Sequence, residues 1–178
     1  DAGFYYENDT FLIDASGVGM VGVDSVLTVI RFDASTADAA RAVVATNVTG
    51  LTLRDFRVTN GYDGVWFRNV DASNLERVRA DSHGYRGFDL DANSGANTLT
   101  GNTTSGNGSD GISIGGDGST LAGNLSSGNA GAGLFVEGNS NLLRHNRSFG
   151  NGSDGVYLDG ADNFLTQNTI DSNAAWGI

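Results

Sequence analysis

Cysteine, proline and lysine are all absent from this chain of 178 residues. Without cysteine the chain has neither a disulfide framework nor a thiolate metal site. The absence of proline suits strand ladders, which need every backbone N–H donor. No apolar run approaches the roughly 18 residues that span a bilayer, and the chain begins at Asp1 without a methionine or a charged-then-apolar leader. We therefore expect a processed, soluble protein with no membrane insertion.

Positive charge is also scarce. Acidic residues outnumber basic residues by 21 to 10, which gives a formal net charge of −11 at pH 7. A surface of this sign repels the phosphates of nucleic acids and of anionic membranes. We therefore exclude nucleic acid as a partner.

Glycine is abundant, and one glycine recurs at a regular interval. It returns after 22 to 24 residues, and two apolar residues spaced two apart follow each of these glycines except Gly177, which only Ile178 follows. Asparagines recur four and nine positions before it. Self-similarity with a period in the low twenties is typical of a solenoid. The recurring glycines are Gly64, Gly87, Gly111, Gly133, Gly155 and Gly177.

Each repeat contains the pattern of three short strands. Apolar residues one and three positions after the glycine predict a strand with one buried face. A leucine column lies twelve positions before the glycine, and a third strand is centred seven before it. No helical stretch fits between these strands, which excludes a leucine-rich repeat. We predict an all-β fold: a single-stranded right-handed parallel β-helix, or β-solenoid, with about 22 residues and three short strands per coil.

The repeat also predicts the domain organisation. We expect a single β-helix domain over residues 1–178. The regular coils occupy residues 47–178, and residues 1–46, where the repeat is weaker, form irregular upper coils.

The recurring asparagines have a structural explanation. Asparagine tolerates left-handed backbone angles at corners, and its amide can bond the same side chain one coil above and below. Asn8 and Asn47 are then the only reasonable glycan acceptors, and only in a glycosylating host. The other five Asn-x-Ser/Thr matches fall in ladder positions where a glycan would not fit: Asn102, Asn107, Asn124, Asn146 and Asn151.

The outward positions of the glycine strand carry aromatic, acidic and arginine side chains. The other outward faces are mostly threonine, serine, alanine and glycine. Sugar rings stack on aromatic side chains and sugar hydroxyls bond charged groups, so we predict an extended polysaccharide along this face. The alternative is a solvated face with a few exposed aromatic residues. The predicted substrate-binding residues are Asp63, Trp66, Arg68, Asp110, Phe135, Tyr157 and Asp159.

One coil departs from the pattern, because His83 stands where later coils have asparagine. Arg86, Asp89 and Asp91 should project near it. A histidine, two carboxylates and an arginine are the groups needed to abstract a proton next to a sugar carboxylate and to neutralise the resulting enolate-like charge. The alternative is that His83 caps a corner as asparagine does. Arg86 would then pair with one of its acidic neighbours, Asp63, Asp89 or Asp91, which is ordinary on an acidic surface.

We expect no cofactor and no metal site. His145, the only other histidine, belongs to a different side of the coil from His83, which excludes a shared site. Calcium is the one alternative, because Asp89, Asp91 and Asp110 offer oxygen ligands, but the sequence has no EF-hand pattern.

Two stretches resemble known families. From Asn97 onward, repeats such as Asn-Thr-Leu-Thr-Gly-Asn-Thr-Thr-Ser-Gly-Asn-Gly-Ser-Asp-Gly-Ile-Ser-Ile are similar to those of polysaccharide lyases, mannuronan C5-epimerases and NosD-type periplasmic proteins, and the resemblance covers residues 47–178. The segment Tyr85-Arg86-Gly87-Phe88-Asp89-Leu90-Asp91 is similar to the Tyr-Gly-Phe-Asp-Pro-His segment of the epimerases, with Arg86 inserted and Leu90-Asp91 replacing Pro-His. The resemblance implies a right-handed β-helix and a catalytic role for Asp89, although such repeats serve enzymes and non-enzymes alike.

These observations lead to two hypotheses of different classes. The first is an extracellular or cell-surface β-helix that binds or modifies a polysaccharide, as a lyase or a uronate C5-epimerase if it is an enzyme. The second is a non-catalytic solenoid that associates end to end through the open coil at Ile178, forming a filament or surface layer. A third interpretation makes the chain a fragment of a longer β-helix.

Overall fold

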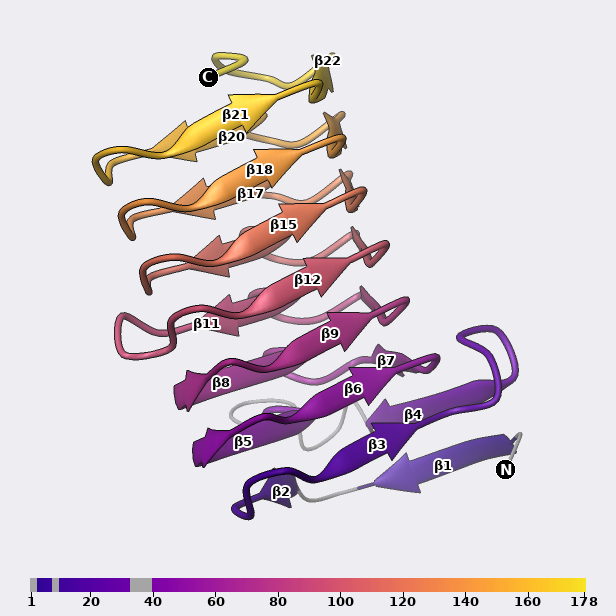
Figure 1. Ribbon diagram of the computed structural model, residues 1–178. Helices are drawn as coiled ribbons and strands as arrows, with labels where there is room; N and C mark the ends of the chain where they lie inside the picture. The colour runs from indigo at the N-terminus through magenta and orange to yellow at the C-terminus, as the bar shows by residue number, and fades with distance from the viewer. Residues whose placement is uncertain (1–2, 8–9, 33–39) are drawn as a thin grey trace.

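The computed structural model describes residues 3–7, 10–32 and 40–178. Within these residues all regular structure is β, and the strands wind into a stack of coils with three parallel sheets along its length (Figure 1). The first and last described strands lie at opposite ends of the stack. The predicted β-solenoid with three short strands per coil is confirmed.

The first sheet, named here the β2–β20 sheet, contains the strands that follow the recurring glycine. Neighbouring strands pair in parallel register, so that Phe88 lies between Val65 and Ile112. These apolar side chains are buried, as the period-two alternation predicts. The strands, in sheet order, are β2 (Phe11–Ile13), β5 (Val43–Thr49), β8 (Val65–Asp71), β11 (Phe88–Leu90), β14 (Ile112–Ile114), β17 (Leu134–Val136) and β20 (Val156–Leu158).

The second sheet, the β3–β21 sheet, contains the leucine column. Leu75, Leu99, Leu121 and Leu143 follow one another in register, and each side chain is fully buried. Burial of one leucine side chain stabilises a fold by about 1.5–3 kcal/mol. The strands are β3 (Gly19–Val21), β6 (Thr52–Arg54), β9 (Asn74–Glu76), β12 (Thr98–Thr100), β15 (Thr120–Ala122), β18 (Leu142–Arg144) and β21 (Phe164–Thr166).

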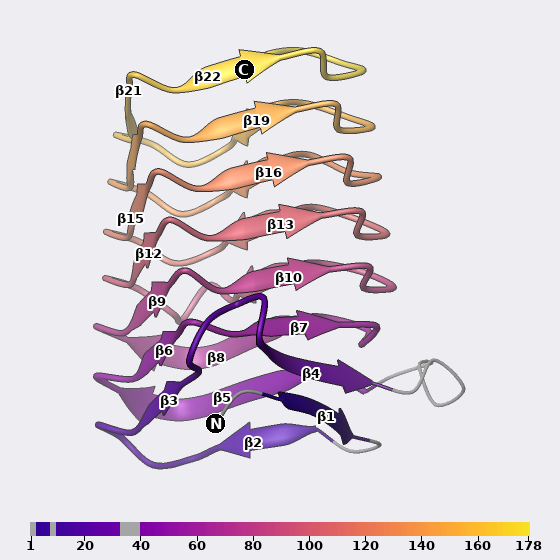
Figure 2. The same ribbon diagram turned by 90° about the vertical axis from the view of Figure 1, so that its right-hand side faces the viewer.

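The third sheet, the β1–β22 sheet, faces the viewer in Figure 2. Its inward column consists of small side chains in the middle coils, where the Thr104 hydroxyl donates to Ser126 Oγ at 3.0 Å. The strands are β1 (Gly3–Glu7), β4 (Thr28–Phe32), β7 (Arg57–Thr59), β10 (Arg79–Asp81), β13 (Thr103–Ser105), β16 (Leu125–Ser127), β19 (Arg147–Phe149) and β22 (Thr169–Asp171).

Crowding at the start of each strand in the β2–β20 sheet explains the recurring glycine. A Cβ atom added at Gly87 would lie 2.6 Å from the Gly111 carbonyl oxygen, 2.9 Å from Asn107 Nδ2 and 2.9 Å from Thr104 Cγ2. All three neighbours come from the next coil. The glycine therefore permits successive coils to approach each other closely.

The asparagine ladders are present and continuous. Asn124 Oδ1 accepts hydrogen bonds from the backbone N–H and the side-chain amide of Asn102, both at 3.0 Å. Its own Nδ2 donates to the Leu99 carbonyl at 2.9 Å and to Asn146 Oδ1 at 3.0 Å. The five ladder asparagines within glycosylation motifs are buried, whereas Asn47 is exposed. Asn8 lies outside the described residues.

Candidate functional site

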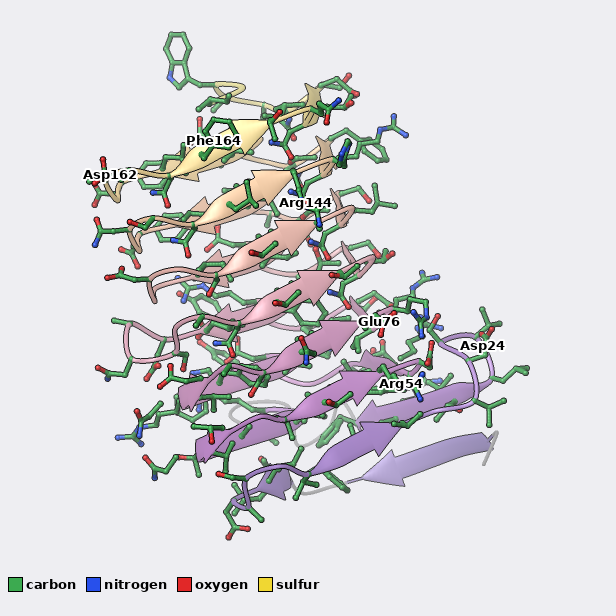
Figure 3. All side chains as sticks on the ribbon, viewed as in Figure 1. Asp24, Arg54, Glu76, Arg144, Asp162 and Phe164 are labelled. Atoms are coloured by element: carbon green, nitrogen blue, oxygen red, sulfur yellow. The ribbon has the colours of Figure 1, made fainter. Side chains whose placement is uncertain are left out.

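The outward face of the β2–β20 sheet carries a depression of about 460 Å³. We call it the acidic depression, and its lining residues are Arg86, Asp89, Leu90, Asp91, Ala92, Ser113, Gly115 and Glu137. The other outward faces differ in character. The β3–β21 face presents Arg54, Glu76, Arg144 and Phe164 (Figure 3). A groove of about 520 Å³ follows a corner of the stack, but glycine, alanine, serine, asparagine and the buried His83 line it, without a carboxylate or a guanidinium.

An insertion after β11 shapes one rim of the acidic depression. The connection from β11 to β12 is two residues longer than the connection from β14 to β15, and it loops outward beside β11 in Figure 1. Asp91 Oδ1 holds this turn by accepting hydrogen bonds from Asn93 N at 3.1 Å and from the Ser94 hydroxyl at 2.7 Å. A Cβ atom added at Gly115 would lie 2.8 Å from Ala92 N, so the turn packs directly against the next coil.

Arg86 connects the charged groups at the other rim. Its guanidinium donates to Asp89 Oδ1 at 2.9 Å through one terminal nitrogen and to Asp110 Oδ2 at 3.2 Å through Nε. The guanidinium carbon also lies 5.0 Å from the centre of the Tyr85 ring and 5.8 Å from that of Phe135. The two carboxylates and the tyrosine raise the pKa of Arg86 against the opposing effect of burial. These contacts hold Arg86 between two aromatic rings and in contact with two carboxylates.

Asp63 lies deeper than predicted. We expected an outward, substrate-binding side chain, but only 1% of it is exposed. Arg41 covers it and donates from Nε to Asp63 Oδ2 at 2.9 Å, while Arg86 N donates to Oδ1 at 3.1 Å. Burial and the nearby charge of Asp89 raise the pKa of Asp63 above its ordinary value. Asp63 thus fastens one coil to the next and is not accessible to a ligand.

His83 is also buried, with 3% of its surface exposed. Nδ1 accepts a hydrogen bond from Gly61 N at 3.1 Å, which places the proton on Nε2, and Nε2 donates to the Val58 carbonyl at 3.2 Å. Burial lowers the pKa of His83 to about 4. His83 therefore reproduces the two-sided bonding of a ladder asparagine. This geometry matches the alternative in which His83 caps a corner, and it leaves no ring nitrogen free to act as the predicted base.

The aromatic side chains of this face lie against other groups. The Arg41 guanidinium carbon lies 3.9 Å from the centre of the Trp66 ring. Phe135 and Tyr157 stack on each other with centroids 4.8 Å apart and planes 6° apart. Only Tyr157 exposes a large part of its surface, 40%. The predicted stacking platform for sugar rings is therefore largely occupied by contacts within the protein.

The remaining predicted residues do not lie together in one site. Asp110 is buried, and its Oδ1 accepts a hydrogen bond from Ala132 N at 2.9 Å, so it fastens neighbouring coils as Asp63 does. Arg68 and Asp159 are exposed and do not line the acidic depression. The structure thus brings together Arg86, Asp89 and Asp91 from the predicted catalytic set, and leaves His83 beneath the surface.

Several residues of this face were missed by the sequence analysis. Glu137 and Ser113 line the acidic depression and occupy the outward columns already assigned to ligand binding. Tyr62 and Tyr85 stack with centroids 5.2 Å apart, and both stand two positions before a recurring glycine. Arg41 lies 23 residues before Gly64, the first regular glycine, and this spacing places it one coil earlier on the same face. The sequence could have identified Arg41 from this spacing.

In residues 3–7, 10–32 and 40–178, no group of three or more histidine, aspartate or glutamate side chains is placed to hold a metal ion. The same described part of the chain contains no helix long and apolar enough to cross a membrane.

Over its whole described length the fold is similar to that of the A-module of a mannuronan C-5 epimerase from Azotobacter vinelandii, with a TM-score of 0.74 and 17% identity over 99% of this chain and 64% of that one. A periplasmic alginate epimerase gives a TM-score of 0.61 at 15% identity, over 97% of this chain and 57% of the other. A pectate lyase gives a TM-score of 0.68 at 14% identity, over 93% of this chain and 54% of the other.

At these identities the likeness concerns the fold, and this chain spans 64% or less of each of these three structures. No curated protein sequence matches the chain. A family match is nevertheless clear: residues 40–178 match the family described as a right-handed beta helix region. This match also confirms the predicted handedness of the coil. The chain therefore belongs to the right-handed β-helix family.

Proposed function

We propose that this protein binds or modifies a polysaccharide at the acidic depression, outside the cell or at its surface. The observation that carries the proposal is the depression itself, where Asp89, Asp91 and Glu137 surround an open space together with Arg86 and the Ser113 hydroxyl. Carboxylates and hydroxyls placed around one hollow are the groups that hold sugar hydroxyls. The similarity in fold to alginate epimerases and a pectate lyase supports a polysaccharide as the ligand class.

The depression extends along the stack. Asp89 and Asp91 come from the coil of β11, Ser113 from that of β14 and Glu137 from that of β17. Three successive coils span about 10 Å at the usual strand spacing. A polymer lying along the solenoid axis would therefore contact equivalent outward positions of consecutive coils.

If the protein is an enzyme, Asp89 is the residue that we propose to act in proton transfer. It is half-buried, and Arg86 holds its Oδ1 at 2.9 Å, which orients the carboxylate. Arg86 is also bound to Asp110 at 3.2 Å, so its role is to fix the position of the Asp89 carboxylate. His83 is left out of this assignment because both of its ring nitrogens are hydrogen-bonded below the surface.

Binding measurements test the proposal. Affinity electrophoresis in gels containing a panel of polysaccharides should retard the wild-type protein with at least one of them. Glu137→Gln and Asp89→Asn should weaken that binding by about tenfold or more, because each removes a charged acceptor worth about 1.5–3 kcal/mol. Glu76→Gln is the matched control, since Glu76 lies on the outward face of the β3–β21 sheet (Figure 3). Equal binding by all variants would remove the depression from consideration.

Self-association is a second candidate function. Phe164, Trp176 and Ile178 expose 63%, 79% and 69% of their surfaces at one end of the stack. Apolar surface of this extent favours contact with another surface, which we propose is another copy of the chain stacked end to end. Sedimentation velocity should show mass increasing with protein concentration, and Trp176→Ser should reduce the increase. A wild-type protein that stays monomeric at all concentrations contradicts this function.

A further inference from the structure

The charges around the acidic depression constrain the kind of polysaccharide that it accepts. Its lining carries three carboxylates, those of Asp89, Asp91 and Glu137, and one guanidinium, that of Arg86. The buried Asp110 lies directly behind and shares the same guanidinium. The formal charge of these five groups is therefore four negative against one positive.

The single positive charge is already engaged. Arg86 contacts Asp89 at 2.9 Å and Asp110 at 3.2 Å, so two carboxylates neutralise it before any ligand arrives. Arg41 cannot compensate, because it is paired with Asp63 at 2.9 Å and lies on the Trp66 ring at 3.9 Å. No second arginine of the described residues lines the depression.

Asp91 and Glu137, in contrast, have no arginine partner among the described residues. Asp91 Oδ1 accepts hydrogen bonds from Asn69 N, Asn93 N and the Ser94 hydroxyl, which are uncharged donors. Glu137 is exposed and lies two coils further along the stack. A sugar carboxylate placed between these two side chains would meet like charges from both sides, whereas a sugar hydroxyl could donate to either.

We infer that the acidic depression binds a glycan whose sugars carry hydroxyl groups and no carboxylates, and that it rejects polyuronates. This inference rests on the proposed polysaccharide-binding function. It departs from the uronate activity that the resemblance of the Tyr85–Asp91 segment implies. The departure follows from electrostatics, because like charges facing each other across an interface strongly suppress binding.

Titration calorimetry with two matched sets of oligosaccharides tests the inference. Uncharged gluco- and manno-oligosaccharides should bind, with an affinity that is independent of salt. Mannuronate and galacturonate oligomers of the same length should bind at least about a hundredfold more weakly at low ionic strength. The difference should shrink as added salt screens the repulsion. Each titration is run once with a chelator and once with calcium.

A charge-reversal variant supplies the positive control. Glu137→Lys should improve polyuronate binding by about tenfold or more, since an exposed negative charge at the rim becomes positive. Glu76→Lys, on the β3–β21 face, should leave polyuronate binding unchanged. Circular dichroism should confirm that both variants are folded.

The outcomes separate the two claims. Polyuronate binding as tight as that of the uncharged glycans, with or without calcium, overturns the inference and leaves the proposed function standing. Binding of the uncharged glycans alone supports both the inference and the proposed function. If no glycan of either set binds, the proposed function itself is refuted, and the inference with it.

Discussion

Replacement of His83 by asparagine tests whether this histidine is a part of the structural ladder. His83 Nδ1 accepts from Gly61 N, and Nε2 donates to the Val58 carbonyl. One coil further on, Asn107 makes the equivalent donation to the Ala80 carbonyl at 3.3 Å. An asparagine at position 83 can therefore remake the bond to the Val58 carbonyl, and its Oδ1 supplies an acceptor in place of Nδ1. We expect His83→Asn to change the free energy of unfolding at pH 7 by no more than about 1 kcal/mol.

A nonpolar replacement should behave differently. His83→Leu leaves the Gly61 N–H buried without its partner and removes the bond that the side chain donates to the Val58 carbonyl. The unpaired N–H costs about 1–3 kcal/mol and the lost bond about 0.5–1.5 kcal/mol, so the variant should lose about 1.5–4.5 kcal/mol. The contrast between the two variants separates the hydrogen bonds from the volume of the side chain.

The pH dependence supplies the sharper measurement. Burial lowers the pKa of His83 from 6.5 to about 4, so the unfolded chain binds the proton more readily than the folded protein does. The contribution to stability is complete above pH 6.5 and is lost as the pH falls toward 4. From these two values the loss is about 2 kcal/mol at pH 5 and about 3 kcal/mol at pH 4. His83→Asn lacks this titration.

Urea unfolding of the wild-type protein and of His83→Asn at pH 7, 5 and 4 measures this difference. Other titrating groups are common to both proteins and cancel in the comparison. We expect the variant to become the more stable protein as the pH falls. Parallel pH profiles, or a His83 imidazole that titrates near pH 6.5 in NMR spectra of the folded protein, would refute the assignment.

Three further predictions concern the frame of the stack. Gly87→Ala should destabilise the fold by about 1–3 kcal/mol in thermal unfolding, because its Cβ would meet the next coil at 2.6 Å. Asn124→Leu should cost about 2–6 kcal/mol in urea unfolding, since it strips partners from two buried backbone groups. Asp81→Asn should lower the free energy of unfolding at pH 7, and this loss of stability should shrink as the pH falls below 3.8. Hydrogen bonds and charge from Arg57 and Arg79 outweigh burial and lower the pKa of Asp81, so its stabilisation is lost on protonation.

The sequence predicts the fold because the repeat imposes the same environment on every coil. Leu75 and Leu99 stand in one column of the sequence and pair in one register of the β3–β21 sheet. The spacing of Asn102 and Asn124 likewise anticipates the hydrogen bond between their side chains. A period-two pattern determines whether a side chain faces the core, and in a solenoid the equivalent side chain of the next coil has the same orientation.

The site is less predictable, because a side chain that points outward can still be covered by a neighbour. Asp63 leaves the strand in the outward direction, yet Arg41 lies over it and Arg86 N binds it from the next coil. Trp66 faces outward beneath the same arginine. Such coverage depends on the lengths and conformations of particular side chains, which the repeat does not specify.

The insertion after β11 can also be predicted from the sequence only in part. The interval of 24 residues between Gly87 and Gly111 is visible in the sequence and indicates extra residues in that coil. It does not indicate that Asp91 would hold the extra turn beside Gly115 and so create one rim of the acidic depression. The departure from the period marks the coil in which the candidate site lies.

A crystal structure of the protein with an uncharged oligosaccharide tests the central claim most directly. We predict sugar rings in the acidic depression, with hydroxyls donating to Asp89 and Glu137 and with Arg86 still bound to Asp89 and Asp110. An oligosaccharide bound in the corner groove beside Gly84 and Gly108, or a polyuronate occupying the depression instead, would contradict it.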